Sequence, residues 1–161
     1  MEENVTGAIF LGENKTESPD VEIQIVKSWN EREIEDLYRA GGWWREEWDQ
    51  AELSTLMRGS YAFAVAIERA TGHAVGMGRV ISDGISDAYL QDVVVSPAFR
   101  NHSIGCRIVE ELVSSCLQRG ISWIGCIATP NSAGFYHDLG FREMRGFTPL
   151  LYKGKGNDCT L

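Results

Sequence analysis

The sequence predicts a mixed α/β domain in which an antiparallel meander of strands leads into one long helix and then into a strand that returns parallel to the meander. Three observations support this fold class. Strand-like segments follow one another between residues 61 and 95, apolar residues recur at helical spacing over 104–116, and a nearly continuous apolar run spans 121–128. Such a run is typical of a strand buried on both faces, as in a parallel pair. The expected order of elements is β-α-α-β-β-β-α-β-α-β-β.

The composition is that of a globular protein with one domain. The chain has 161 residues, of which 43% are hydrophobic and 24% charged, which excludes wholesale disorder. Its net charge of −8 argues against a non-specific nucleic-acid binder, because phosphate contacts need a basic surface. No signal-peptide pattern is visible, and no apolar stretch approaches the roughly 20 residues of a membrane span. The cysteines lack CxxC spacing and are expected to be reduced, in a cytoplasmic protein (Cys106, Cys116, Cys126 and Cys159).

Residues 1–20 are polar and are expected to form a flexible extension, which leaves 21–161 as the single domain. Within the extension only the run Ala8–Leu11 is apolar enough to pack, as an edge strand or as a contact with a partner. In a homodimer, this run or the last strand of the chain would be the contact.

The first strand and two helices are marked by alternation and by capping signals. Alternating Val and Ile residues predict a strand over 21–27. A helix over 28–42 opens with a capping box, Ser28 and Glu31, and a second helix spans 49–59. The remaining elements are expected at 61–67, 73–82 and 89–95 (strands), 104–116 (long helix), 121–128 (strand), 131–137 (short helix capped by Asn131) and 147–153 (last strand).

The segment 91–106 runs from a strand through a short loop directly into the long helix. A helix start offers unpaired N–H groups and the positive end of the helix dipole, which together suit a phosphate or pyrophosphate. Gly105 has no side chain to obstruct a close approach, and Arg100 can add positive charge. An ordinary strand-to-helix turn is the alternative interpretation of this segment.

A second segment, Asn131–Phe141, reads by itself as a capped short helix whose Phe135 and Tyr136 pack in the core. Together, however, the two segments resemble the GNAT superfamily of acyl-CoA-dependent N-acetyltransferases. Arg100-x-x-Ser103-x-Gly105 is similar to the family's Arg/Gln-x-x-Gly-x-Gly/Ala loop, which holds the CoA pyrophosphate. The second segment is similar to the family pattern Asn-x-x-Ala-x-x-Phe-Tyr-x-x-x-Gly-Phe, with Asn131 one residue closer to the alanine.

This resemblance implies a central sheet that splays apart at a bulge near Val93–Val94, with helices on both faces. It also implies transfer of an acetyl group from acetyl-CoA, without a metal, by direct attack of a primary amine, either of a small cationic molecule or of a peptide. No nucleic acid or membrane is implied as a partner. Tyr136 would donate a proton to the leaving thiolate. The residues that the resemblance assigns to CoA are Val93, Val94, Val95, Arg100, Asn101, His102, Ser103, Ile104, Gly105, Cys106 and Asn131.

Ser103 departs from the family pattern, which usually has glycine at this position. The backbone N–H survives, but close backbone approach or a positive φ is less easily reached. The serine can also cap the helix and offer a hydroxyl group to a phosphate. The departure supports an alternative function, a non-catalytic acyl-CoA-binding module or sensor.

Asp92 is the candidate base that removes the proton from the attacking amine. It stands in an otherwise apolar strand beside the expected thioester site. The alternative is that Asp92 pairs with Arg79 on the neighbouring strand and only supports the structure.

The acceptor site is expected between the first two helices. Residues 31–52 hold eight acidic residues and three arginines, together with Trp43, Trp44 and Glu46. Aromatic faces beside carboxylates suit a cationic amine. The alternative is a solvated acidic helix pair with tryptophans that fill the core, which is the interpretation we favour for Trp48.

Overall fold

A computed structural model describes residues 18–154, and they form five strands, four α-helices and one 3-10 turn. The elements in chain order are β1 (Val21–Ile25), α1 (Glu31–Ala40), α2 (Glu52–Gly59), β2 (Ala62–Glu68), β3 (Ala74–Ser82), β4 (Asp87–Val95), η1 (Pro97–Phe99), α3 (Ile104–Leu117), β5 (Trp123–Cys126) and α4 (Ala133–Asp138).

The strands form one sheet in the order β1-β2-β3-β4-β5. The first four are antiparallel neighbours, and β5 pairs parallel with β4, as the sequence predicted. The parallel pairing covers only the first half of β4, where Asp87–Leu90 lie opposite Trp123–Cys126. Beyond Leu90, β4 continues without β5 at its side, which confirms the expected splay.

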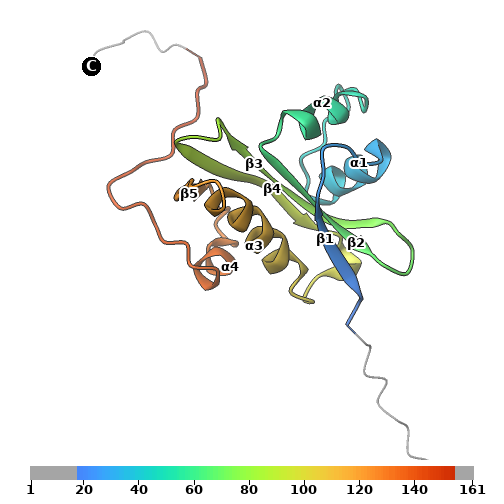
Figure 1. The fold of residues 1–161 in the computed structure, drawn as a ribbon. Coiled ribbons are helices and arrows are strands. Elements are labelled where there is room, and N and C mark those ends of the chain that lie inside the picture. The colour runs from blue at the N-terminus through green and yellow to red at the C-terminus, as the bar shows by residue number, and fades with distance from the viewer. Residues whose placement is uncertain (1–17, 155–161) are drawn as a thin grey trace, which may run out of the picture.

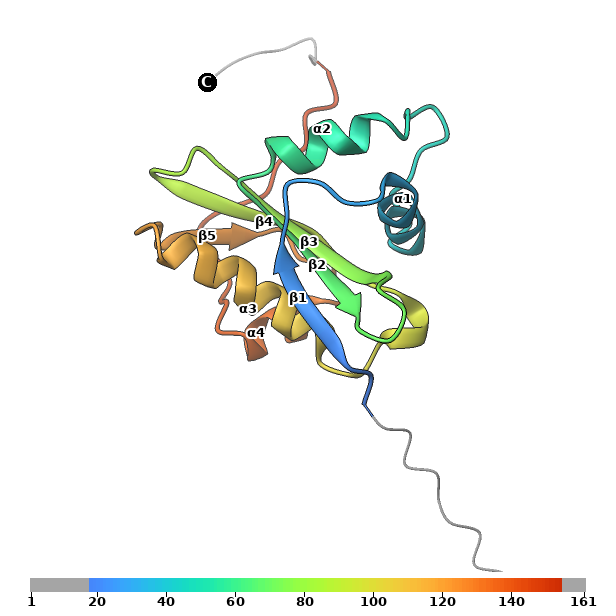
Figure 2. The same cartoon turned by 45° about the vertical axis from the view of Figure 1, so that its right-hand side comes forward.

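Helices cover both faces of the sheet, as expected (Figures 1 and 2). On one face α1 and α2 pack through an apolar cluster that includes Ile34, Leu37 and Met57. On the other face α3 buries its apolar stripe against β1–β4, with α4 beside it. The stripe consists of Ile104, Ile108, Val109, Leu112 and Cys116. The sheet therefore lies between two firmly packed layers.

Two predicted helix caps were wrong. The side chain of Asn30, not Ser28, accepts hydrogen bonds from the N–H groups of Arg32 and Glu33 at the start of α1. Ser132, not Asn131, is the residue before α4, and its side chain makes no capping bond. In both places several short polar residues stand side by side, so the sequence offered more than one residue able to cap.

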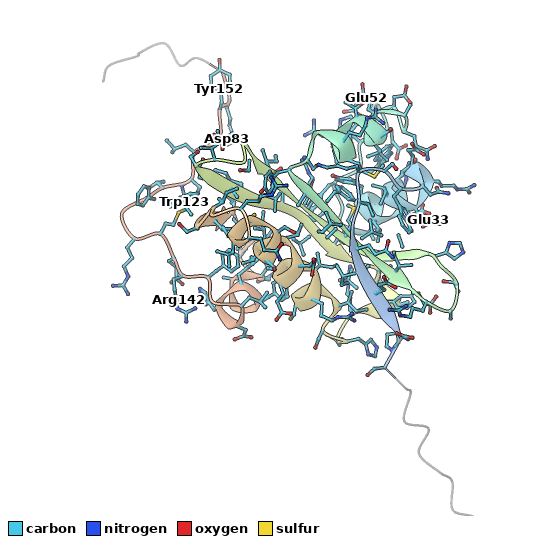
Figure 3. All side chains as sticks on the ribbon, in the orientation of Figure 1. Glu33, Glu52, Asp83, Trp123, Arg142 and Tyr152 are labelled. Carbon is cyan, nitrogen blue, oxygen red and sulfur yellow. The ribbon has the colours of Figure 1, made fainter. Side chains whose placement is uncertain are left out.

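The predicted last strand is absent from the described part of the chain. After α4, residues 141–154 form no helix or strand, so neither of the two final strands in the expected order is present. The apolar side chains of this tail are exposed, with Leu150 at 91% and Leu151 at 82%. Figure 3 shows Tyr152 projecting from the tail away from the sheet and helices.

Most of the expected N-terminal extension, including Ala8–Leu11, lies outside the described residues, as does Cys159. Cys106, Cys116 and Cys126 are free thiols, in agreement with the prediction. Within residues 18–154, none of the helices has the length and apolar character needed to cross a membrane.

Candidate active site

A β-bulge interrupts β4 where its pairing with β5 has ended. Met77 pairs with Val94 and Arg79 pairs with Gln91, so Gly78 faces two residues, Asp92 and Val93. Asp92 adopts a φ of +55°, which residues other than glycine adopt rarely. The bulge therefore lies one residue before the position that the family resemblance implied.

The bulge exchanges the two faces of the strand. Before it, Ala88 and Leu90 belong to the core cluster under α3, and after it Val93 and Val95 pack on that same cluster. Uninterrupted alternation would place residue 92 on the α3 face as well. The extra residue instead directs the Asp92 side chain towards α1, where Tyr38 contacts it.

The Asp92 carboxylate is held through one oxygen. Its Oδ2 accepts hydrogen bonds from Arg79 Nε at 2.5 Å and from the Tyr38 hydroxyl at 2.7 Å. Its Oδ1 receives no hydrogen bond from any residue in 18–154. The pairing with Arg79 that the sequence suggested is present, and Oδ1 keeps its lone pairs free to accept a hydrogen bond.

The loop before α3 is a turn with two left-handed residues, Asn101 and Ser103, at φ of +66° and +57°. Ser103 thus adopts the conformation for which the family uses glycine, and its hydroxyl does not cap the helix. Arg100 folds back, and its Nε donates to the carbonyl of Val95 at 3.1 Å. The N–H groups of Ile104, Gly105 and Cys106 begin the helix and have no acceptor within it.

Gly105 brings this loop close to α4. A Cβ at position 105 would lie 3.5 Å from the Phe135 ring and 3.7 Å from Val95. The end of β4, the start of α3 and α4 therefore meet around one residue without a side chain. His102 and Asn131 are exposed near these elements and make no side-chain hydrogen bond to another described residue.

Tyr136, which the resemblance implied as the thiolate donor, packs among aromatic side chains of α4 and the segment after it. Its ring makes edge contacts with Phe135 and Phe141 at 5.0 and 5.5 Å between centroids, so the packing role expected from the pattern is present. Its hydroxyl makes no hydrogen bond with another described residue. Burial raises the pKa of Tyr136 to about 12, so it remains a proton donor. It lines a cavity of about 510 Å³ together with Cys126 and Phe141.

The tryptophans expected at the acceptor site form an aromatic cluster around Tyr38. Trp43 and Trp48 each meet the Tyr38 ring edge-on at 6.3 Å, and Trp44 meets Trp48 at 5.7 Å. Trp43 reaches this position because Gly41 has no Cβ, which would lie only 2.6 Å from the indole. Trp48 is 37% exposed, so the expectation that it fills the core was wrong.

The charged residues of the cluster are partly neutralised. Arg39 binds both oxygens of Glu46, at 2.6 and 3.1 Å, and also lies over the Trp44 ring. In contrast, Asp49 and Glu52 form no ion pair with another described residue. They line a cavity of about 410 Å³ with Trp44 and Trp48. Glu47 likewise forms no ion pair with a described residue, so negative charge remains available to a cation both beside Glu46 and near the start of α2.

The arrangement fits a CoA thioester. The open edge of β4 can pair with an extended amide chain, and the α3 N-terminus can bind phosphate groups. Among residues 18–154 there is no cluster of three or more His, Cys, Asp or Glu side chains that could bind a metal.

Sequence reasoning missed Tyr38 as a residue of the site. Its spacing from Ile34 and Leu37 placed it on the apolar face of a helix, and it is indeed 2% exposed. The signal was available, because a buried tyrosine hydroxyl needs a hydrogen-bond partner. The sequence alone did not identify that partner as Asp92.

Comparisons with known proteins agree with this geometry. Residues 59–143 match the family model described as acetyltransferase (GNAT) domain. The chain is 37% identical over 70 residues to serotonin N-acetyltransferase 2, chloroplastic, of Oryza sativa subsp. japonica, which is 44% of this chain and 35% of that protein. It is 31% identical over 146 residues to histone acetyltransferase TAP1 of Glycine max, which is 82% of this chain and 62% of that protein.

The fold is also similar to that of a solved structure. The GNAT family acetyltransferase SP0256 from Streptococcus pneumoniae TIGR4 superposes with a TM-score of 0.71 at 21% identity. The superposition covers 85% of this chain and all of the other. At this identity the likeness establishes the fold alone.

Proposed function

Since the chain belongs to the GNAT family of acyl-CoA-dependent acetyltransferases, we propose that it transfers the acetyl group of acetyl-CoA to a primary amine by direct attack. One observation carries the proposal. Beyond Leu90, β4 has an open edge with a bulge at Asp92, and this edge leads through a short loop to the N-terminus of α3.

The residues of the site have distinct tasks towards acetyl-CoA. The N–H groups of Ile104, Gly105 and Cys106 and the Arg100 guanidinium bind the pyrophosphate. Asn101, His102 and Ser103 shape that loop, and Asn131 borders it from the start of α4. The backbone of Val93, Val94 and Val95 pairs with the pantetheine arm, as an added strand would.

The chemistry requires that the amine lose a proton. A lysine-like amine has a pKa of about 10.4 and is protonated at neutral pH. Oδ1 of Asp92 accepts this proton, directly or through a water molecule. The amine lone pair then forms the C–N bond, the C–S bond breaks, and the electron pair leaves on sulfur. The Tyr136 hydroxyl donates a proton to that thiolate and regains one, through solvent, as the nitrogen loses its second proton to become the neutral amide. A backbone N–H near Val93 polarises the carbonyl group.

The acceptor we propose is a small cationic amine that carries an aromatic or apolar group. The cavity lined by Trp44, Trp48, Asp49 and Glu52 supports it, because it combines ring surfaces with unpaired carboxylates. Trp43 and Glu46 lie in the segment 41–51 that joins α1 to α2, which we call the acceptor loop. The name of the rice relative points to an aromatic amine, whereas that of the soybean relative points to a protein amine. A peptide amine is therefore the second candidate.

Release of the CoA thiol, measured with a thiol-reactive dye, tests the proposal. The panel is tryptamine, tryptophan, a polyamine and a lysine peptide. Amine-dependent thiol release with tryptamine as the best acceptor supports the proposal, and preference for the peptide selects the second candidate. Binding of acetyl-CoA without release for any amine would instead support the non-catalytic acyl-CoA-binding module. The cytoplasmic location and the homodimer stay predictions.

A further inference from the structure

We infer that Tyr38 is a positioning residue for acetyl transfer, which fixes Asp92 in the bulge of β4 and couples the bulge to the aromatic acceptor loop. The inference deepens the proposed function and rests on it. Nothing in the family resemblance or in the comparisons assigns a role to Tyr38.

The bulge needs support from side chains. Asp92 has a backbone conformation that residues other than glycine keep only where the surroundings determine it. The surroundings here are two donors to one oxygen, Arg79 Nε and the Tyr38 hydroxyl. Arg79 stands on β3, next to the bulge in the sheet, and its guanidinium also donates to Gln91. Tyr38 comes from α1 and, among the described residues, is the one outside the sheet that hydrogen-bonds to the Asp92 side chain.

Tyr38 is itself fixed on three sides. Its ring is buried between Trp43 and Trp48, with edge contacts to both. Its backbone carbonyl accepts a hydrogen bond from the Trp43 N–H at 3.0 Å. Its hydroxyl ends at Asp92. Burial raises the pKa of Tyr38, so the hydroxyl stays protonated and acts as a donor to the carboxylate.

These contacts make Tyr38 a rigid link between the two substrates' sites. The acceptor loop after α1 determines where the ring lies, and the hydroxyl determines where Oδ2 of Asp92 lies. Because Oδ2 is held, Oδ1 is the oxygen left to face the amine. Tyr38 acts through Asp92 and touches neither the proposed CoA loop nor Tyr136. Its loss should therefore impair the chemical step and leave CoA binding intact.

The test compares Tyr38→Phe with Tyr61→Phe. Each variant removes one hydroxyl, but that of Tyr61 has no hydrogen-bond partner in the described chain. We expect Tyr38→Phe to lower kcat by roughly 10- to 100-fold, as a small misplacement of a reacting group does. The Kd of acetyl-CoA should stay within about 2-fold, and Tyr61→Phe should change neither quantity. A kcat for Tyr38→Phe equal to that of the parent overturns the inference.

Two further readouts separate positioning from general loss of structure. In an Asp92→Asn background, Tyr38→Phe should have little additional effect on kcat, because both changes act on one carboxylate. Multiplication of the two effects would contradict the inference. Hydrogen exchange of the amides of residues 92–95 should accelerate in Tyr38→Phe and not in Tyr61→Phe.

The exchange readout needs no turnover, so it distinguishes two failures. If the parent acetylates none of the amines, the proposed function fails, and faster exchange in Tyr38→Phe still shows that the hydroxyl holds the bulge. If the parent is active and exchange in Tyr38→Phe is unchanged, the proposed function stands and the role of Tyr38 is refuted.

Discussion

Along Ala88–Leu90, β4 has a hydrogen-bonded strand on each side, whereas along Gln91–Val95 it has one only on the side of β3. The first half is regular: Ala88 and Leu90 are buried in the core under α3, and Tyr89 between them is 39% exposed. The second half contains a bulge, a left-handed aspartate and an ion pair. Its open edge leaves backbone donors and acceptors for a ligand, which the fully paired half cannot offer.

The comparison teaches that the polar residues of the site lie where strand pairing ends. In the second half, the departure of β5 leaves room for Asp92, Arg79 and a hydroxyl from α1. The predictions below test whether the difference between the halves is functional.

The largest effect should come from Asp92→Asn, because it removes the proposed base and keeps a residue that tolerates a positive φ. We expect kcat to fall by roughly 10²- to 10⁴-fold, the range of general base catalysis. Asp87→Asn makes the same chemical change in the paired half and should leave kcat within about 2-fold. Steady-state thiol release measures both. An equal fall of kcat in the two variants would show that the two halves of β4 do not differ in function.

Tyr136→Phe keeps the ring that packs between Phe135 and Phe141 and removes the hydroxyl. If the hydroxyl assists the leaving thiolate, kcat should fall by roughly 10- to 1000-fold with little change in CoA affinity. Because burial raises the pKa of Tyr136 to about 12, the parent should show no loss of activity from its ionisation below about pH 11. An unchanged kcat, with chemistry shown to limit the rate, would assign Tyr136 to packing alone.

A pair of changes at Gly105 tests the end of the open edge. Alanine fits there, since its Cβ would be in ordinary contact with Phe135 and Val95. Valine adds two methyl groups beyond this Cβ, and they would crowd the place where Phe135 and Val95 meet the start of α3. We expect acetyl-CoA to raise the melting temperature of the parent and of Gly105→Ala, and the shift to be lost in Gly105→Val. A full shift in Gly105→Val would place CoA elsewhere.

A smaller effect is expected where the acceptor loop meets solvent. Reversal of Glu46 and Glu47 to lysine should raise KM for a cationic amine several-fold. The change Glu46→Lys also replaces the ion pair with Arg39 by a repulsion between two positive charges. The KM for acetyl-CoA should stay nearly constant. Reversal of Glu110 and Glu111 on α3 changes the net charge equally and serves as control.

Added salt should weaken the parent's preference for cations, because exposed charges are screened over about 8 Å at physiological ionic strength. Faster turnover of tryptophan than of tryptamine by the parent would refute the electrostatic argument.

The sequence predicted the regular parts of this molecule for physical reasons. The apolar repeat of α3 requires a buried stripe on one helix face, and the structure has it. The apolar run at 121–128 correctly indicated a parallel strand, but the expected burial on both faces was wrong: β5 spans only Trp123–Cys126 at the edge of the sheet, and Trp123 and Ile127 are 42% and 77% exposed. The side-chain direction of Asp92 could not be predicted from the sequence. The alternation of side chains between the two faces of a strand holds only where the strand is regular, and β4 has a bulge at this residue. The bulge depends on contacts between Arg79, Tyr38 and Asp92, which are distant along the chain.

The tail is the other place where the sequence misled. Alternation over 147–153 predicted a strand, but a strand exists only where a neighbour supplies hydrogen bonds. In the described chain the outer edge of β5 has no such neighbour, and the tail runs past it without pairing.

The smallest predicted effect concerns this tail and sharpens the contrast between paired and unpaired edges. In the structure Leu150 and Leu151 are almost fully exposed, so the double change to serine should alter the free energy of unfolding by less than about 0.5 kcal/mol. Leu112→Ala, in the buried stripe of α3, should cost about 2–5 kcal/mol and gives the scale of a packed leucine. Urea denaturation followed by circular dichroism measures all of these. A loss of several kcal/mol from the tail variant would mean that residues 147–153 pack in solution as the sequence pattern predicts. The outer edge of β5 would then be paired, and the second half of β4 would be the one open strand edge at that side of the sheet.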